Sequence, residues 1–407
     1  MDTSISKQTF IPVILGGNLG GYSTARSFYE AYNVSSVVVC SLVTGAIDHS
    51  VFIEPFVSKN MMKPDDFIQT LKELDKKYGD KKILLIGSSD NHVELIVQHR
   101  DQIPANWIVP YIDEQKFYYG TNKESFYEIC ERIGVPYPKT KVIHQLDLDL
   151  PFDYPIIIKP ADSMKWHEIS FPGKMKVYLC ENEEQYKKIV QDVYDNHYEG
   201  SLILQEYIRG DDSAMGVVTC YSDKDQHEVK LISFGQTLLE DHTPSAIGNH
   251  LSILTREEKQ VTEDVKKLLA ELQWTGFSNF DLKYDERDQT YKFFELNARL
   301  GRSNYYVTAA GANTATYYVR DFIKEEPIPY QVSREEILYS AVPKRLLLAN
   351  IQSTKTQQKV KELYRRKKVF HPLNSPQEPQ WKRKLYVKMA TMNYFKKFKQ
   401  YPQNPDF

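Results

Sequence analysis

The chain has 407 residues, 41% of them hydrophobic, with 28 Tyr and 19 Phe. This length predicts two to four domains, and the composition excludes wholesale disorder. The net charge of −2 hides an asymmetry, because residues 341–407 carry 16 Lys and Arg against three acidic side chains, whereas residues 1–340 carry 36 basic and 51 acidic ones.

The four cysteines are far apart and form no CxxC pair. This pattern argues against a zinc site or a disulfide scaffold and fits a reducing compartment. No stretch approaches the roughly 20 apolar residues of a membrane span. The apolar run at 11–15 lacks the flanking features of a signal peptide. We therefore expect a cytoplasmic protein.

Apolar strands alternate with helical stretches up to about residue 110. The strands are predicted at 10–15, 36–40, 82–87 and 107–110, and the helices near 22–33, 64–78 and 91–100. Such alternation predicts an α/β fold with a parallel sheet covered on both faces. Further along, helices are predicted at 122–133, 182–196 and 256–271, and strands at 154–162, 175–180, 201–212, 213–221 and 228–236.

The first strand runs into a glycine-rich turn, LGGNLGGYSTARSF, that opens a helix. Amides at a helix start favour an anion. A nicotinamide dinucleotide also needs an acidic residue at the end of the second strand, but that strand ends in Cys40 and Ser41. Dinucleotide binding, a tight turn without a ligand and a site for a small anionic substrate remain alternatives.

Polar side chains interrupt an apolar strand in FFELNARLGRSNYY. The turn YDERDQ predicts a hairpin that sets Asp281 beside Glu295, and Asn297 points to the same face as Glu295. Three converging oxygen ligands suit a hard divalent cation such as Mg²⁺. The alternative is a carboxylate pair neutralised by Arg299 or Arg302.

Three further features are ambiguous when taken singly. Lys159 ends the apolar strand PIIIK and either reaches the surface or faces a buried anion. Lys123 starts a helix and by itself suits a solvated lysine. The stretch QEYIRGDD is either a plain strand end or a place where backbone groups meet an adenine and Asp212 meets a ribose.

The order of these features resembles the ATP-grasp superfamily over residues 10–325. Its most specific part is FELNARLGRS following SNFDLK. The resemblance implies a Rossmann-like pre-ATP-grasp domain at 1–115, a small ATP-grasp lobe at 116–205 and a large lobe with the metal site at 206–330. A basic C-terminal extension at 331–407 follows.

The resemblance assigns residues to ATP. Lys123 and Lys159 are expected to hold the phosphates, and the adenine and ribose are expected to contact Gln205, Glu206, Ile208 and Asp212. The family's flap over the phosphates is usually glycine-rich, whereas ADSMKWHEISFPGKMK contains one glycine. Side chains of Lys165, His167 or Lys174 are expected to replace some of its amide contacts.

The resemblance also assigns the metals. Asp281, Glu295 and Asn297 are expected to hold two Mg²⁺ ions, for which Mn²⁺ can substitute, with Glu295 bridging them. Arg299, together with Lys159, is expected to act catalytically by neutralising the transferred phosphate and the acyl-phosphate.

Three segments are similar to the D-aspartate ligases that build peptidoglycan cross-bridges: FIPVILGGNLGGYSTARSFYEAY, LLEDHTPSAIGNH and GRSNYYVTAAG. This similarity implies that ATP activates D-aspartate as an acyl-phosphate, which the lysine of a UDP-linked muramyl pentapeptide attacks. An ATP-grasp ligase making a small dipeptide or amide, and a non-catalytic nucleotide-binding adaptor, are the competing hypotheses.

An aspartate substrate carries a second carboxylate. Arg302 and the turn at Gly17 and Asn18 suit that group, and Ser303 and Asn304 suit further polar contacts. The alternatives are a surface arginine and a capping turn.

His242 is our candidate for the group that accepts a proton from the attacking amine, because the pKa of histidine lies near operating pH. The alternative is a loop histidine whose hydrogen bonds are satisfied by its neighbours.

The C-terminal extension interleaves Lys and Arg with Tyr, Phe and Trp. This pattern suits the diphosphate of a nucleotide-linked acceptor or an anionic membrane surface, and we expect no nucleic acid partner. The alternative is a helical appendage that packs its aromatic side chains on the main body and points its cations outward.

Overall fold

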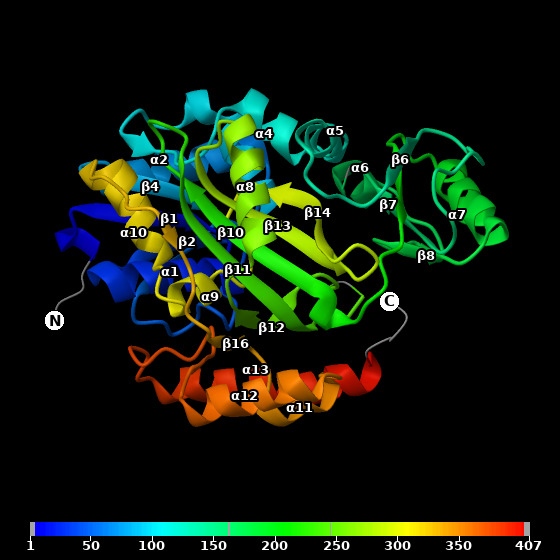
Figure 1. The fold of residues 1–407 in the computed structure, drawn as a ribbon. Coiled ribbons are helices and arrows are strands. Elements are labelled where there is room, and N and C mark those ends of the chain that lie inside the picture. The colour runs from blue at the N-terminus through cyan, green and yellow to red at the C-terminus, as the bar shows by residue number, and fades with distance from the viewer. Residues whose placement is uncertain (1–4, 162, 245, 403–407) are drawn as a thin grey trace.

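The computed structural model describes residues 5–402 except 162 and 245 and contains three β-sheets with helices around them (Figure 1). The strands are β1 (Phe10–Leu15), β2 (Ser36–Cys40), β3 (Ile53–Val57), β4 (Lys82–Gly87), β5 (Trp107–Ile108), β6 (Thr140–Ile143), β7 (Ile156–Pro160), β8 (Tyr178–Cys180), β9 (Leu202–Glu206), β10 (Met215–Ser222), β11 (Val229–Glu240), β12 (His250–Thr255), β13 (Gly276–Asp285), β14 (Thr290–Asn297), β15 (Gln331–Val332), β16 (Leu338–Ser340) and β17 (Val369–Phe370). The helices are α1 (Leu19–Tyr32), α2 (Pro64–Tyr78), α3 (Asp90–Gln98), α4 (Glu114–Thr121), α5 (Lys123–Ile133), α6 (Ser163–Glu168), α7 (Glu183–Asp195), α8 (Lys259–Glu271), α9 (Tyr305–Ala309), α10 (Thr314–Tyr318), α11 (Lys344–Asn350), α12 (Thr354–Arg365) and α13 (Trp381–Gln400).

The first sheet is parallel, with strand order β3-β2-β1-β4-β5. Its central strands β1, β2 and β4 are almost wholly buried, as expected for a sheet covered on both faces. The predicted Rossmann-like α/β arrangement is therefore confirmed. Strand β3 was not predicted, because its sequence IEPFV contains a glutamate and a proline, which edge strands tolerate.

The second sheet is small and antiparallel, with order β6-β9-β7-β8. With α6 and α7 it forms a lobe set to one side of the molecule (Figure 1). Strand β9 ends at Glu206, and the chain crosses from there into the largest sheet.

The largest sheet follows the order β14-β13-β10-β11-β12-β16-β17, with β15 beside β11. Strands β15, β16 and β17 come from the C-terminal extension, so this segment completes the sheet. Helices α11, α12 and α13 then form a layer beneath the sheet (Figure 1).

The four cysteines are buried and unpaired. No helix within the described residues combines the length and the apolar character that a membrane-crossing segment requires.

A buried ion pair fastens the C-terminal extension to the first domain. Arg383 Nε lies 3.2 Å from Glu378 Oε1, and both side chains are almost fully buried. Glu378 also accepts hydrogen bonds from Ser50 Oγ (2.6 Å) and Val51 N (3.1 Å). Arg383 donates to the carbonyl oxygens of Asp48 and Ala46. An ion pair and hydrogen bonds to the backbone thus join the C-terminal extension to the first domain.

We expect Glu378→Ala to lower the free energy of unfolding by about 3–5 kcal/mol, because it leaves the buried Arg383 charge without its carboxylate and with carbonyl oxygens alone. Urea denaturation measures this loss. The control is Glu362→Ala, which breaks an exposed pair with Arg366 and should cost about 1 kcal/mol or less. Equal losses in the two variants would show that the buried pair has no special role.

Candidate active site

The predicted metal-binding side chains meet on the hairpin of β13 and β14. Asp281 is directly opposite Glu295, and Asn279 is opposite Asn297. Asn297 Nδ2 donates to Asp281 Oδ2 over 3.2 Å. The hairpin, with a register shift between Asp281 and Leu282, thus places all three oxygen-bearing side chains together at one end of the strand pair.

Lysines from earlier segments of the chain lie close to the Glu295 carboxylate. Lys123 Nζ, at the start of α5, lies 3.4 Å from Glu295 Oε2. Burial opposes the charge of Glu295, but Lys123, Lys159 and Lys176 outweigh it and lower its pKa to about 2. Glu295 is therefore a carboxylate at neutral pH, and its side chain is 34% exposed and open to a ligand.

Lys159 lies at the end of β7 and approaches the same carboxylate. Burial, reinforced by the neighbouring charge of Lys123, lowers its pKa to about 7. Its Nζ lies 3.5 Å from the hydroxyl of Tyr127 and above the ring of Phe294. A lysine in this setting is stabilised in its charged form by an added anion.

Arg299 connects this cluster to the first domain. Its Nη2 donates to Asp90 Oδ2 (2.6 Å), at the first residue of α3, and to Asn297 Oδ1 (3.3 Å). Burial opposes the charge of Arg299, yet the Asp90 carboxylate raises its pKa. A cation bound by Asn297 Oδ1 must therefore compete with Arg299 for that oxygen.

A cavity of about 210 Å³ opens between the two lobes beside the lysines. Its apolar walls include Ile157, Val177, Met215 and Phe294. The predicted nucleotide residues that line it are Lys159, Gln205, Glu206, Ile208 and Asp212. A narrow apolar slot with polar groups at its ends suits a flat heteroaromatic base.

The polar end of the cavity is built around Asp212. This carboxylate accepts hydrogen bonds from Glu240 N (2.8 Å) and His242 Nε2 (2.9 Å). Burial lowers the pKa of His242, but its bond to Asp212 reverses the effect and raises it. The structure therefore pairs His242 Nε2 with Asp212, whereas Nδ1 is buried without a hydrogen-bond partner among the described residues, so the alternative of a satisfied histidine holds for one ring nitrogen only.

Glu206 and Gln205 have fixed positions at the crossing between the lobes. Glu206 Oε2 pairs with Arg287 Nη2 (2.8 Å) in the β13–β14 turn, and its Oε1 accepts from Lys139 N. Gln205 Nε2 donates to the Tyr127 hydroxyl over 2.8 Å. Both side chains are engaged by protein groups, and the Glu206 amide donates to the carbonyl of Lys139 (3.0 Å). Ile208 therefore contributes the apolar side chain at this part of the slot.

The predicted substrate residues gather where α1 begins. Asn18 Oδ1 caps α1 by accepting from Gly21 N (3.0 Å), and the Gly17 carbonyl accepts from Thr44. Asn18 and Arg302 line a second cavity, of about 330 Å³, whose opposite wall is the C-terminal helix α13.

Ser303 and Asn304 are buried behind this turn. Asn304 Nδ2 donates to the carbonyl oxygens of Gly20 (3.2 Å) and Gly301 (2.9 Å), which holds the loop against α1. Arg302 is exposed, whereas these two residues support the loop that presents it.

The flap segment contains the short helix α6. Lys174 Nζ donates to the carbonyl of Ile169 (2.6 Å), within the flap itself. Lys176 acts on Glu295 and Lys159 through its charge. The side chain of His167 lies outside the described residues.

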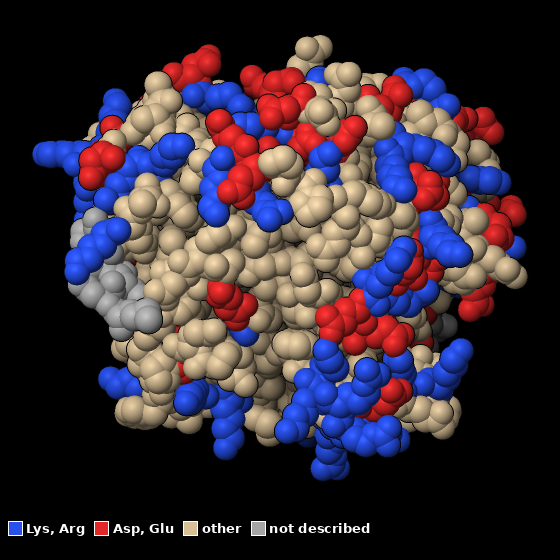
Figure 2. All heavy atoms as spheres, turned by 60° about the vertical axis from the view of Figure 1, so that its left-hand side comes forward, with Lys and Arg blue, Asp and Glu red and all other residues tan. Residues whose placement is uncertain are grey.

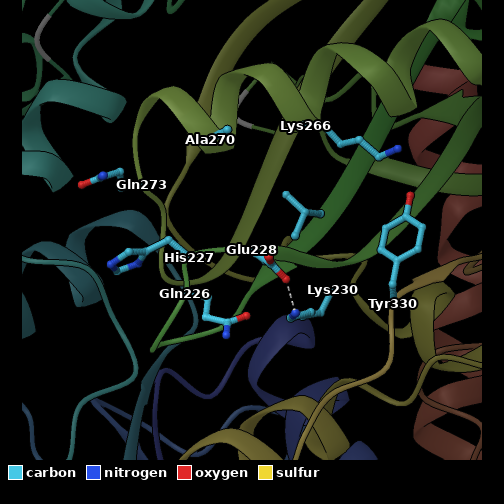
Figure 3. Close-up of a pocket in the computed structure, with 9 residues that line it drawn as sticks. Gln226, His227, Glu228, Lys230, Lys266, Ala270, Gln273 and Tyr330 are labelled. Atoms are coloured by element: carbon cyan, nitrogen blue, oxygen red, sulfur yellow. Dashed lines mark hydrogen bonds and ion pairs between the residues drawn. The ribbon is translucent and has the colours of Figure 1, made fainter.

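A larger hollow, of about 520 Å³, lies elsewhere (Figure 3). Lys230 pairs there with Glu228 (2.6 Å), and the other lining side chains include His227, Lys266 and Tyr330. It contains none of the predicted site residues, and the charges of Lys230 and Glu228 neutralise each other. It is not the catalytic site.

Several residues of the site were not identified from the sequence. Lys283 and Glu240 line the nucleotide cavity, and His250 Nε2 lies 3.4 Å from Asp281 Oδ1. Lys283 had one usable signal, since it lies two residues after Asp281 on the same strand and shares its face. Asp90 carried no local signal, because its contact with Arg299 spans 209 residues.

The residues present fit a nucleotide with a divalent cation. Glu240 lines the cavity, and its buried Oε1 makes no hydrogen bond among the described residues, with His250 Nδ1 3.5 Å away; Arg299 Nε is also buried without a hydrogen-bond partner there. The first is an acceptor and the second a donor suited to an anion. No group of three or more His, Cys, Asp or Glu in the described parts of the chain forms a complete metal site. Two carboxylates and an amide instead suit Mg²⁺ completed by phosphate and water.

A curated relative decides the family. The D-aspartate ligase of Enterococcus faecium (strain Aus0004) is 34% identical over 416 residues, which covers 98% of this chain and 99% of the relative. The chain belongs to the D-aspartate ligase family. It is an ATP-dependent carboxylate–amine ligase, as predicted. No family model matches the sequence.

Solved structures confirm the ATP-grasp fold. The L-amino acid ligase of Bacillus licheniformis has a TM-score of 0.53 at 14% identity, with 77% of this chain and 74% of that chain covered. The biotin carboxylase domain of the Hydrogenobacter thermophilus 2-oxoglutarate carboxylase, in complex with MgADP, gives 0.58 at 15%, with 80% and 72% covered. The carboxyaminoimidazole ribonucleotide synthase of Aspergillus clavatus, complexed with ATP, gives 0.56 at 14%, with 81% and 80% covered.

We expect ATP affinity to fall as pH rises through 7. Lys159 has its pKa lowered to about 7, so it is largely protonated below that pH and neutral above it. Phosphate binds the protonated form, so the Kd should rise about tenfold between pH 7.0 and 8.5. Calorimetric titration with the nucleotide measures this change.

The matched control is Lys159→Arg, which stays charged throughout and should show a much flatter pH profile. A wild-type Kd that does not change over the same range would contradict the position of Lys159 at the phosphates.

Proposed function

We propose that this enzyme joins the β-carboxylate of D-aspartate to the lysine side chain of a UDP-linked muramyl pentapeptide, with release of ADP and phosphate. The near full-length similarity to the Enterococcus faecium D-aspartate ligase supports the choice of acid. The chemistry is carried by one observation: Glu295, paired with Asp281 on the hairpin, lies 3.4 Å from Lys123 and within the charge of Lys159, which lines the nucleotide cavity.

We assign the phosphate-binding role to Lys123 and Lys159, and the metal-binding role to Asp281, Glu295 and Asn297. Two Mg²⁺ ions held by these three side chains would neutralise the phosphate oxygens when bound. Ile208 and the backbone of Gln205 and Glu206 hold the adenine, and Asp212 holds the ribose.

The reaction has two steps. A carboxylate oxygen of the acid attacks the γ-phosphorus of ATP, which yields an acyl-phosphate and ADP. The amine then attacks the acyl carbon, phosphate leaves, and the amine nitrogen loses a proton. Lys159 and Arg299 stabilise the charge that develops on the transferred phosphoryl group, and the cleft aligns the reactants.

We assign Arg302 and the turn at Gly17 and Asn18, before α1, to binding of the amino acid substrate and the amine acceptor. Ser303 and Asn304 position the loop that carries Arg302. His242 remains our candidate for proton transfer, although its bond to Asp212 favours a role in orienting that carboxylate.

Hydroxylamine in place of the acceptor tests the choice of acid. We expect D-aspartate with Mg-ATP to give ADP and aspartyl hydroxamate, detected by mass, and L-aspartate to give none. Hydroxamate formed from another acid would confirm the ligase chemistry but show that D-aspartate is not the substrate, which favours the alternative of a small-dipeptide ligase. An absence of product even with the pentapeptide present would contradict the assignment.

Glu295→Gln tests the metal assignment. Loss of this charge should lower kcat by about 10²–10³-fold, because a charge-stabilising contact of the transition state is removed. ADP release in single-turnover experiments measures the effect. Glu286→Gln, on the exposed turn of the same hairpin, is the control and should retain full activity. Wild-type rates in Glu295→Gln would refute the role of Glu295.

A further inference from the structure

The outer face of α13 carries a row of exposed apolar side chains. Trp381 is 69% exposed, Leu385 48%, Met389 64% and Met392 51%. Spacings of four, four and three residues place these side chains on one face of the helix. A contiguous exposed apolar row marks an interaction surface.

The opposite face of α13 is firmly packed. Arg383, Val387 and Phe398 are buried, and Lys397 Nζ pairs with Asp241 Oδ2 over 3.0 Å. The helix is therefore held to the body on one side, and the exposed row is a second apolar face.

The charge of α13 limits what can bind that row. The helix contains no acidic residue. Its exposed lysines are Lys382, Lys384, Lys388, Lys396 and Lys399. Figure 2 shows Lys and Arg gathered along the lower edge of the molecule, where the C-terminal helices lie in Figure 1.

We propose that this face of α13 binds the surface of an anionic lipid bilayer, with the helix lying in the plane of the headgroups. The apolar row enters the boundary between headgroups and acyl chains, and the lysines reach the anionic headgroups. Tryptophan favours that interface. The lysines along the helix keep it on the surface of the bilayer.

Other occupants suit the surface less well. A symmetric contact with a second copy places the lysines of two α13 helices against each other, which repels. Single-stranded nucleic acid needs aromatic stacking platforms, whereas Trp381 is the one aromatic side chain in a row completed by Leu and Met. The proposal does not depend on which acid or amine the enzyme joins.

Tryptophan fluorescence gives a site-specific test, because Trp107, Trp166 and Trp274 are buried and Trp381 alone is exposed. With vesicles of phosphatidylglycerol and phosphatidylcholine, we expect a blue shift of emission and flotation of the protein. Vesicles of phosphatidylcholine alone should bind at least tenfold more weakly. No shift and no flotation at any phosphatidylglycerol fraction would overturn the proposal.

Variants separate this face from non-specific adhesion. The double variant Leu385→Ser with Met389→Ser keeps the Trp381 reporter and should lose at least tenfold in vesicle affinity, while hydroxamate formation without lipid stays unchanged. Leu148→Ser, at a 52% exposed site in the small lobe, should bind like the wild type. Unchanged binding by the double variant would overturn the assignment to α13. So would a doubled mass in light scattering without lipid that the double variant abolishes, because the row would then be a contact between two copies.

Discussion

The balance of charge around Glu295 is the constraint on which the site depends. Lysines from α5 and β7 converge on one carboxylate of β14, and burial has already weakened the proton affinity of Lys159. Around Glu295 the charges of three lysines, Lys123, Lys159 and Lys176, act on one carboxylate, so this part of the cleft favours a further anion. A bound polyphosphate supplies negative charge opposite the lysines. The cations that accompany it are coordinated by the carboxylates of Asp281 and Glu295.

The cleft is also a junction of three structural units. Asp90 at the start of α3 meets Arg299 beyond β14, and Glu206 at the end of β9 meets Arg287 in the β13–β14 turn. Both contacts join the ends of regular elements. Arg299 also donates to Asn297, and Glu206 lines the nucleotide cavity, so both contacts between units lie next to the site.

The sequence predicted what depends on local spacing. The buried strands β1, β2 and β4 follow from apolar runs, and the structure agrees. The short turn predicts that Asp281 and Glu295 lie side by side, which the structure also shows, but their direct pairing depends on a register shift between Asp281 and Leu282 that the turn does not reveal. Contacts between segments that are distant in the sequence could not be predicted from local spacing. Asp90 is an ordinary helix-start acid until Arg299 reaches it, and Lys176 belongs to a flap whose family pattern is absent. The roles of the site residues rest on the family resemblance, because spacing alone left each of them with a structural alternative.

The join between Glu378, Arg383 and the first domain has a consequence for synthesis. Domains form in order of emergence during translation, N-terminal first, so the parallel sheet and α1 take shape long before residues 378–383 leave the ribosome. Until then the segment from Ala46 to Val51 lacks the groups that meet it in the mature protein. A chain truncated before residue 378 therefore lacks the contacts that Glu378 and Arg383 make with residues 46–51, and this part of the first domain stays exposed to solvent.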